Sequence, residues 1–145
     1  MSYMVKKKRK QSNPGQVVIP ASHPNPPEPH EIDTAWTLAR HFRCTVEFLI
    51  PADDYMRKTA DIIMLGVEWE IKSPIGNSKA TIENQFRRAS KQSKYIVIDT
   101  RRTTLDCDRI EKMLLLELNK RPIIKRVILI KKSATNSVEV VEISR

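Results

Sequence analysis

Apolar residues recur at helical spacing where the ordered part of the chain is expected to begin, near residue 30. They stand at Ile32, Ala35, Trp36, Ala39 and Phe42, which places them on one face of a helix. The segments 78–93 and 106–120 have the same periodicity, and Ser78 is a suitable N-cap for the first of them. These patterns predict three amphipathic helices.

Strand patterns lie between and after these helices. Some alternate between apolar and polar residues, and others are continuous apolar runs of the kind found inside a sheet. The predicted strands are 44–50, 61–64, 67–72, 95–99, 127–130 and 138–143, with a turn at Asn136 and Ser137 before the last. The order is therefore a helix, three strands, a helix, a strand, a helix and two strands. It predicts an α/β fold, a single mixed sheet flanked by helices.

Residues 1–29 differ from the rest of the chain. A basic run at 6–10 is followed by a proline-rich stretch, and proline removes a backbone donor and fixes φ. We therefore expect this stretch neither to pair into a sheet nor to continue a helix. It is predicted to be a flexible basic arm ahead of an ordered domain at 30–145. The arm is either a tether to phosphates or a solvated tail.

The charge adds a preference about partners. The chain has 26 Lys and Arg against 17 Asp and Glu, a formal net charge of +9. A charge of this size predicts a polyanionic binding partner, nucleic acid more often than an anionic membrane. No apolar run reaches the ~18 residues of a membrane span, and there is no secretory h-region, so a cytoplasmic protein is expected. Because the chain has 3 glycines in all, it has no Gly-rich phosphate loop, which argues against a nucleotide-binding kinase or ATPase.

The predicted hairpin gathers charged side chains. If Leu65 and Gly66 form its turn, Asp61 falls opposite Glu70 and the two side chains share one side of the sheet. The strand period of two places Lys72 on that same side and sends the apolar residues to the other. A slip of one residue would bury the charges, so the hydrophobic pattern and the chemistry favour the same register.

Two facing carboxylates need a compensating charge. At a separation of ~4 Å and an effective dielectric constant of ~20 they repel each other by about 4 kcal/mol. A divalent cation offsets this repulsion. We expect Mg²⁺ or Mn²⁺ in preference to Zn²⁺. Lys72 is placed to orient the attacking water or to stabilise developing charge. The alternative is an ordinary surface salt bridge between Lys72 and Asp61 or Glu70.

The D…ExK pattern on adjacent strands, after one helix and before another helix and strand, resembles the PD-(D/E)XK nuclease superfamily. That resemblance implies an αβββαβ core, here with an extra helix and C-terminal strands. The stretch VEWEIKSP at 67–74, with GNS at 76–78 and then Gln85, Arg88, Ala89 and Gln92, resembles the C-terminal nuclease domain of CdiA-type contact-dependent growth-inhibition toxins. The resemblance implies cleavage of nucleic acid, tRNA in several members and DNA in others. It also implies an immunity protein as partner if the chain is a toxin.

The same resemblance implies roles for individual residues. They are metal-binding acids at Asp61 and Glu70, a catalytic lysine at Lys72, a polar helix residue at Gln85 and an extra acid at Glu31. Ala60 stands where the superfamily name has proline. From the residues alone, each of these last two has an alternative role of equal weight. Glu31 can be an acid in the first turn that opposes the dipole of the first helix, and Gln85 can be a solvated helix residue.

Cations follow on the helix at 78–93, at Lys79, Arg87, Arg88 and Lys91. We expect this ridge to hold a phosphate backbone, with Arg101 and Arg102 extending it; the alternative is a solvated cationic face. Taken together, the sequence favours a metal-dependent endonuclease that acts on nucleic acid. RNA, tRNA included, is favoured over DNA only by the family resemblance. The alternative function is a non-catalytic nucleic-acid-binding module.

Overall fold

One mixed sheet organises the molecule. The computed structural model describes residues 14–51, 59–133, 135 and 137–145. Within them seven strands lie in the order β1-β2-β3-β4-β5-β6-β7, and three helices accompany them. The elements are β1 Gln16–Val18, α2 Pro29–Phe42, β2 Thr45–Phe48, β3 Ile62–Met64, β4 Val67–Lys72, α3 Lys79–Ala89, β5 Tyr95–Asp99, α4 Cys107–Lys120, β6 Arg126–Lys132 and β7 Val138–Ile143.

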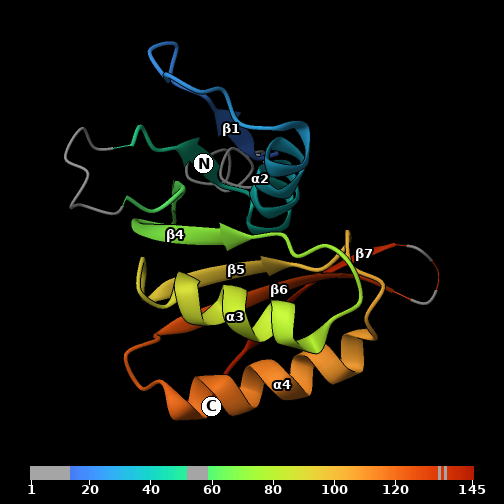
Figure 1. Ribbon diagram of the computed structural model, residues 1–145. Helices are drawn as coiled ribbons and strands as arrows, with labels where there is room; N and C mark the ends of the chain where they lie inside the picture. Colours follow the sequence, from blue (N-terminus) through green and yellow to red (C-terminus); the bar gives the residue numbers. More distant parts are fainter. Residues whose placement is uncertain (1–13, 52–58, 134, 136) are drawn as a thin grey trace, which may run out of the picture.

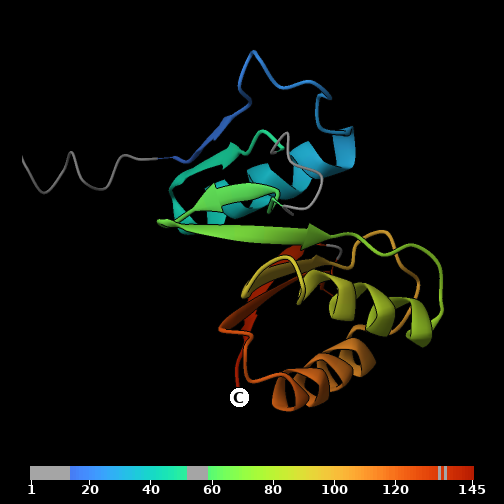
Figure 2. The same cartoon turned by 60° about the vertical axis from the view of Figure 1, so that its left-hand side comes forward.

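The sheet is strongly curled and covered on both faces (Figures 1 and 2). Neighbours β1 and β2 are parallel, β2 to β4 are antiparallel, β4 to β6 are parallel, and β7 returns antiparallel to β6. The helix α2 lies on one face, and α3 and α4 lie side by side on the other. The predicted α/β class, single mixed sheet and element order are confirmed, with β1 added in front.

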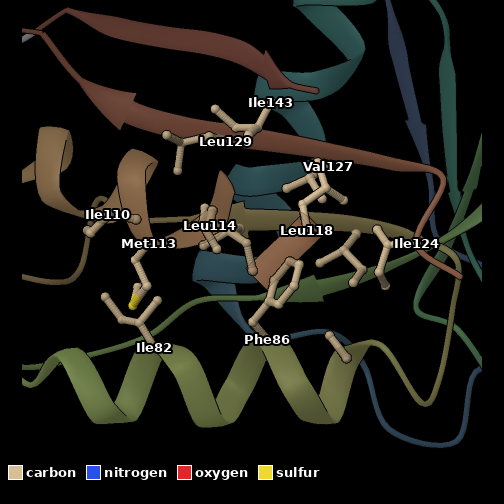
Figure 3. Close-up of a cluster of buried hydrophobic side chains, with 13 residues drawn as sticks. Ile82, Phe86, Ile110, Met113, Leu114, Leu118, Ile124, Val127, Leu129 and Ile143 are labelled. Atoms are coloured by element: carbon tan, nitrogen blue, oxygen red, sulfur yellow. The ribbon is translucent and has the colours of Figure 1, made fainter. Parts of the chain in front are cut away.

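Two hydrophobic layers follow from the period of the strands. Along β5, Ile96 and Ile98 pack against α3 and α4, while Val97 between them packs toward α2. Figure 3 shows the layer under α3 and α4, where Ile82 and Phe86 point into the cluster. Both sides of β5 are therefore buried, as its unbroken apolar run predicted.

The hairpin between β3 and β4 has the predicted register. Met64 pairs with Val67 and Ile62 pairs with Trp69. The turn residues Leu65 and Gly66 have φ of 54° and 77°, and positive φ at both central residues is what a type I′ turn requires. All the apolar side chains of the hairpin strands except Ile63 enter the layer under α2, so the opposite side is left mainly for its charged residues.

The prediction that the proline-rich stretch cannot enter a sheet is wrong for β1. Gln16–Val18 pairs in parallel with the start of β2, since the five residues between Pro14 and Pro20 hold no proline. Gly15, directly before β1, has φ +93°, and a Cβ atom there would lie 2.4 Å from the carbonyl oxygen of Ala39. The basic run at 6–10 and Asn136 of the predicted turn lie outside the described residues.

The other differences concern the ends of elements. The helix α2 begins at Pro29, where proline is well tolerated in the first turn. The helix α3 ends at Ala89, four residues before the predicted end. Among the described residues, no helix combines the length and apolar character needed to cross a membrane.

Candidate active site

Asp61 and Glu70 lie side by side at the end of the hairpin remote from its turn. Asp61 directly precedes β3, and its backbone N–H donates to the carbonyl of Trp69 over 3.0 Å. From the other strand, the N–H of Ile71 donates to Oδ2 of Asp61 over 2.7 Å. The predicted register thus brings both carboxylates to the same side of the sheet, the side that faces α3.

Glu70 is an ionisable group in a buried place. It is 3% exposed, and among the described residues Oε1 finds no hydrogen-bond partner. The Nζ atom of Lys72 lies 3.1 Å from Oε2. Burial, followed by the negative charge of Asp61, raises the pKa of Glu70 to about 7, and Lys72 only partly opposes this rise. The pKa of Asp61 is also raised by burial, against the lowering effect of the Ile71 hydrogen bond.

These two acids and an unsatisfied oxygen have the character of a cation site. Carboxylate oxygens are the donors that Mg²⁺ and Mn²⁺ favour. A buried carboxyl oxygen without a donor is costly unless it is protonated or meets a cation. The residues present therefore fit a hard divalent ion, which Asp61 and Glu70 would hold.

Glu31 reaches the same place from α2. Its charge contributes to the raised pKa of Asp61, and the two residues line one cavity of about 260 Å³. On its other side Glu31 lines a second cavity of about 220 Å³, together with Lys72, Gln85 and Arg88. Four of the five residues predicted for catalysis therefore line two adjoining cavities, and the fifth, Glu70, is buried beside them and paired with Lys72.

The alternative interpretation of Glu31 is also supported. Its Oε1 accepts a hydrogen bond of 2.9 Å from the N–H of Glu28, the residue that caps α2. This reciprocal contact is half of a capping box, which holds the first turn of the helix. The cap fixes one carboxylate oxygen of Glu31 near Asp61, so the structural role places the side chain for a chemical one.

Sequence reasoning missed two neighbours of Glu31. Ligand atoms of Glu28, His30 and Glu31 lie within 4.8 Å of one another, and Nδ1 of His30 is 3.3 Å from Oε2 of Glu28. His30 also lines the second cavity. The three histidines have no metal-ligand spacing along the sequence, but the helix start folds these three side chains together. The run E-x-H-E at 28–31, close to the predicted start of the first helix, is the sequence feature that could have indicated this cluster.

The four cations of the predicted ridge have different surroundings in the structure. Arg88 lines the second cavity beside the acids. Lys79 lies on the other flank, where it lines a separate cavity of about 170 Å³ with Arg109 and Lys112 of α4. Nη2 of Arg87 donates to Asn84 over 2.6 Å, and Lys91 is exposed beyond the end of the helix. Of the four predicted contacts, only Arg88 is therefore beside the acids.

Arg101 does not extend the cationic surface as predicted. Its Nε and Nη2 atoms donate to Asp99 over 3.0 Å and 2.7 Å, and Nη1 lies 3.1 Å from Asp33. The Asp99 carboxylate also accepts the hydroxyl of Thr34 over 2.6 Å. This network ties α2 to the end of β5, and it occupies the guanidinium that a phosphate would need.

Comparisons with known proteins agree on one group. The family model described as the contact-dependent growth inhibition CdiA C-terminal domain matches residues 58–135, which is more than half of the chain. A solved CdiA-CT/CdiI toxin and immunity complex from Burkholderia pseudomallei contains a chain of similar fold, with a TM-score of 0.52 and 16% identity. The match covers 88% of this chain and 99% of that one. Curated proteins give no match.

Proposed function

This chain belongs to the family of contact-dependent growth inhibition CdiA C-terminal domains, and we propose that it is a metal-dependent endonuclease of the PD-(D/E)XK type. The observation that carries the proposal is the buried Glu70 carboxylate, which lies against Asp61 and 3.1 Å from the Lys72 ammonium. A buried pair of like charges is costly as structure alone and is typical of sites where charge is held for chemistry.

Asp61 and Glu70 would hold Mg²⁺ or Mn²⁺ in this proposal. When bound, such an ion lowers the pKa of a coordinated water and neutralises charge on a scissile phosphate. Zn²⁺ fits less well, because its protein sites favour nitrogen and sulfur ligands, and the two acids supply only oxygen. Glu31 lines a cavity with Asp61 and adds a third carboxylate at the edge of the site.

Lys72 would act on the phosphate side of the same site. Its ion pair with Glu70 holds the ammonium near the acids, where it can orient an attacking water and stabilise negative charge that develops on the phosphoryl oxygens. Gln85 and Arg88 line the cavity next to Lys72. Gln85 can position water by hydrogen bonding, and Arg88 can bind a neighbouring phosphate.

The substrate is proposed to be nucleic acid, with RNA, tRNA included, ahead of DNA. The net charge of +9 supports a polyanionic substrate in general. The preference for RNA rests on the resemblance to CdiA-type nuclease domains. Because the similar structure is described as a toxin and immunity complex, we also propose an immunity protein as a partner. The proposed place of action is the cytoplasm, where these substrates are found.

The test is incubation of the purified protein with total RNA and with plasmid DNA, in Mg²⁺ or Mn²⁺ and in EDTA. We expect cleavage that EDTA stops, and its loss in the Asp61→Ala and Glu70→Ala variants. The matched control is Glu68→Ala, which removes an exposed carboxylate from the same strand. If an acid variant cuts as well as the wild type, the site assignment is wrong. Retention of RNA without metal-dependent cutting would favour the non-catalytic binding module.

A further inference from the structure

The two cavities beside the acid pair differ in charge. The second cavity carries the cations Lys72 and Arg88 together with one carboxylate, that of Glu31. The first, of about 260 Å³, has no Lys or Arg among its described lining residues and instead carries the carboxylates of Glu28, Glu31 and Asp61. By their described linings, the first cavity therefore attracts a phosphate group less than the second does. A polynucleotide that crosses the acids would place an uncharged part in the first cavity.

The remaining lining suits the uncharged part of a nucleotide. Pro26 and Pro27 contribute apolar rings, and Phe48 and Ala60 contribute buried apolar surface. Faces of bases are apolar, while their edges carry donors and acceptors. The volume of about 260 Å³ lies below the ~300–1,000 Å³ of sites for drug-sized ligands, so the cavity fits a ring system rather than a whole nucleotide.

One part of the cavity wall, residues 23–27, is held in place before any ligand arrives. Nδ1 of His23 accepts the backbone N–H of Asn25 over 3.3 Å, so Nε2 carries the ring proton and donates to the carbonyl of Leu49 over 3.2 Å. Pro26 and Pro27 follow directly, with φ fixed by their rings. Because the segment is preorganised, little ordering is needed on binding.

We propose that this cavity binds the base of a nucleotide next to the scissile bond, an inference that rests on the proposed nuclease function. The carboxylates around it accept hydrogen bonds, and an acidic side chain pairs with an exocyclic amino group of a base. Adenine, cytosine and guanine have such a group, whereas uracil and thymine do not. The cavity therefore favours an amino-bearing base and disfavours uracil or thymine.

Asn25 and Glu28 are the specificity-determining residues of this subsite. Both are exposed and line the cavity, away from the buried acids. The amide of Asn25 offers one donor and one acceptor, the pair that reads the edge of adenine. Glu28 pairs with His30 through Oε2, and its carboxylate has further acceptor lone pairs that can meet an amino group. Glu28→Gln replaces one carboxylate oxygen with an amide N–H donor, which should allow the carbonyl groups of uracil or thymine to bind.

The test uses single-stranded oligonucleotides that differ only in the base on either side of the mapped cut. We expect kcat/KM to be at least about tenfold higher for an amino-bearing base at one of these positions than for uracil or thymine, the lower part of the range for a base-reading contact. Asn25→Ala and Glu28→Gln should each reduce this ratio severalfold. The matched control Asn119→Ala, an exposed residue of α4, should leave the ratio unchanged.

Several outcomes would overturn the subsite while leaving the nuclease intact. These are equal rates for all four bases at both positions, or an unchanged ratio in both variants when their melting temperatures match that of the wild type. Absence of any metal-dependent cleavage by the wild-type protein would instead overturn the nuclease function, and the subsite with it.

Discussion

The backbone N–H of Ile71 donates a hydrogen bond of 2.7 Å to Oδ2 of Asp61 across the hairpin. Because the donor belongs to the main chain of β4, the Asp61 carboxylate is positioned by strand pairing rather than by its own rotamer preference. One oxygen is engaged in this bond, and the carboxylate also interacts with the side chain of Glu70. The relationship separates the structural role of Asp61 from its proposed chemical one, so substitutions can test each role.

Asp61→Asn keeps an oxygen acceptor for Ile71 but removes the charge. We expect cleavage to fall at least about 100-fold, a change of ~2.7 kcal/mol in the activation barrier. The free energy of unfolding should stay within about 1 kcal/mol of the wild-type value, since repulsion from Glu70 is relieved. Single-turnover cleavage and urea unfolding measure the two effects. Equal loss of activity and of folding would assign Asp61 a structural role only.

The stability of the metal-free protein should depend on the protonation of Glu70. Burial and the charge of Asp61 raise its pKa from 4.5 to about 7 in the folded state. The folded protein therefore holds a proton that the unfolded chain releases above its own pKa. This stabilisation is complete below pH 4.5 and is lost as the pH rises through about 7, with a limit of about 3 kcal/mol.

Unfolding in urea with EDTA, followed from acidic to mildly alkaline pH, measures this linkage. The wild type should lose stability over that window relative to Glu70→Gln, which has no such proton to release. Parallel curves for the two proteins would show that Glu70 is not protonated in the folded state.

Asp99→Ala should destabilise the protein strongly. The carboxylate accepts hydrogen bonds from Arg101 and Thr34, and its removal leaves a guanidinium with only 14% side-chain exposure paired to Asp33 alone. We expect a loss of about 3 kcal/mol in the free energy of unfolding, measured in urea. Asp99→Asn retains an acceptor and should lose about half as much. A loss below about 1 kcal/mol in Asp99→Ala would mean that the network does not hold α2 to β5.

Gly15→Ala tests whether β1 is an integral part of the sheet. The residue has φ +93°, and an added Cβ would lie 2.4 Å from the carbonyl oxygen of Ala39. Gly76 is the matched control, because its φ of +91° imposes the same backbone strain but nothing lies within 4 Å of its Cβ position. We expect Gly15→Ala to cost about 2–3 kcal/mol and Gly76→Ala about 1 kcal/mol. Equal thermal shifts would contradict the close packing of the segment on α2.

The hairpin and its acids could be predicted from the sequence because their determinants are local. A two-residue turn and a period of two are sufficient to bring Asp61 opposite Glu70 and to place Lys72 on the same side. The bounds of β5, Tyr95–Asp99, follow in the same way from an unbroken apolar run. The end of α3 at Ala89 has no glycine or proline to mark it, and the predicted helix was too long.

The remaining parts of the site depend on contacts between distant segments. Glu31 reaches Asp61 only because α2 packs on the sheet, and periodicity does not place a helix end beside a particular strand. The short strand β1 forms through pairing with Thr45 and its neighbours, far along the chain. The engagement of Arg101 by Asp99 likewise required the fold, since the sequence shows only a basic pair after a strand.

The central claim is that Asp61 and Glu70 share a divalent cation. Anomalous diffraction from crystals soaked in Mn²⁺ tests it most directly. We predict a peak between the two carboxylates, bound by Oδ1 of Asp61 and the unpartnered Oε1 of Glu70, and its loss in Asp61→Asn. A peak only among Glu28, His30 and Glu31, or no peak at either place, would contradict the account.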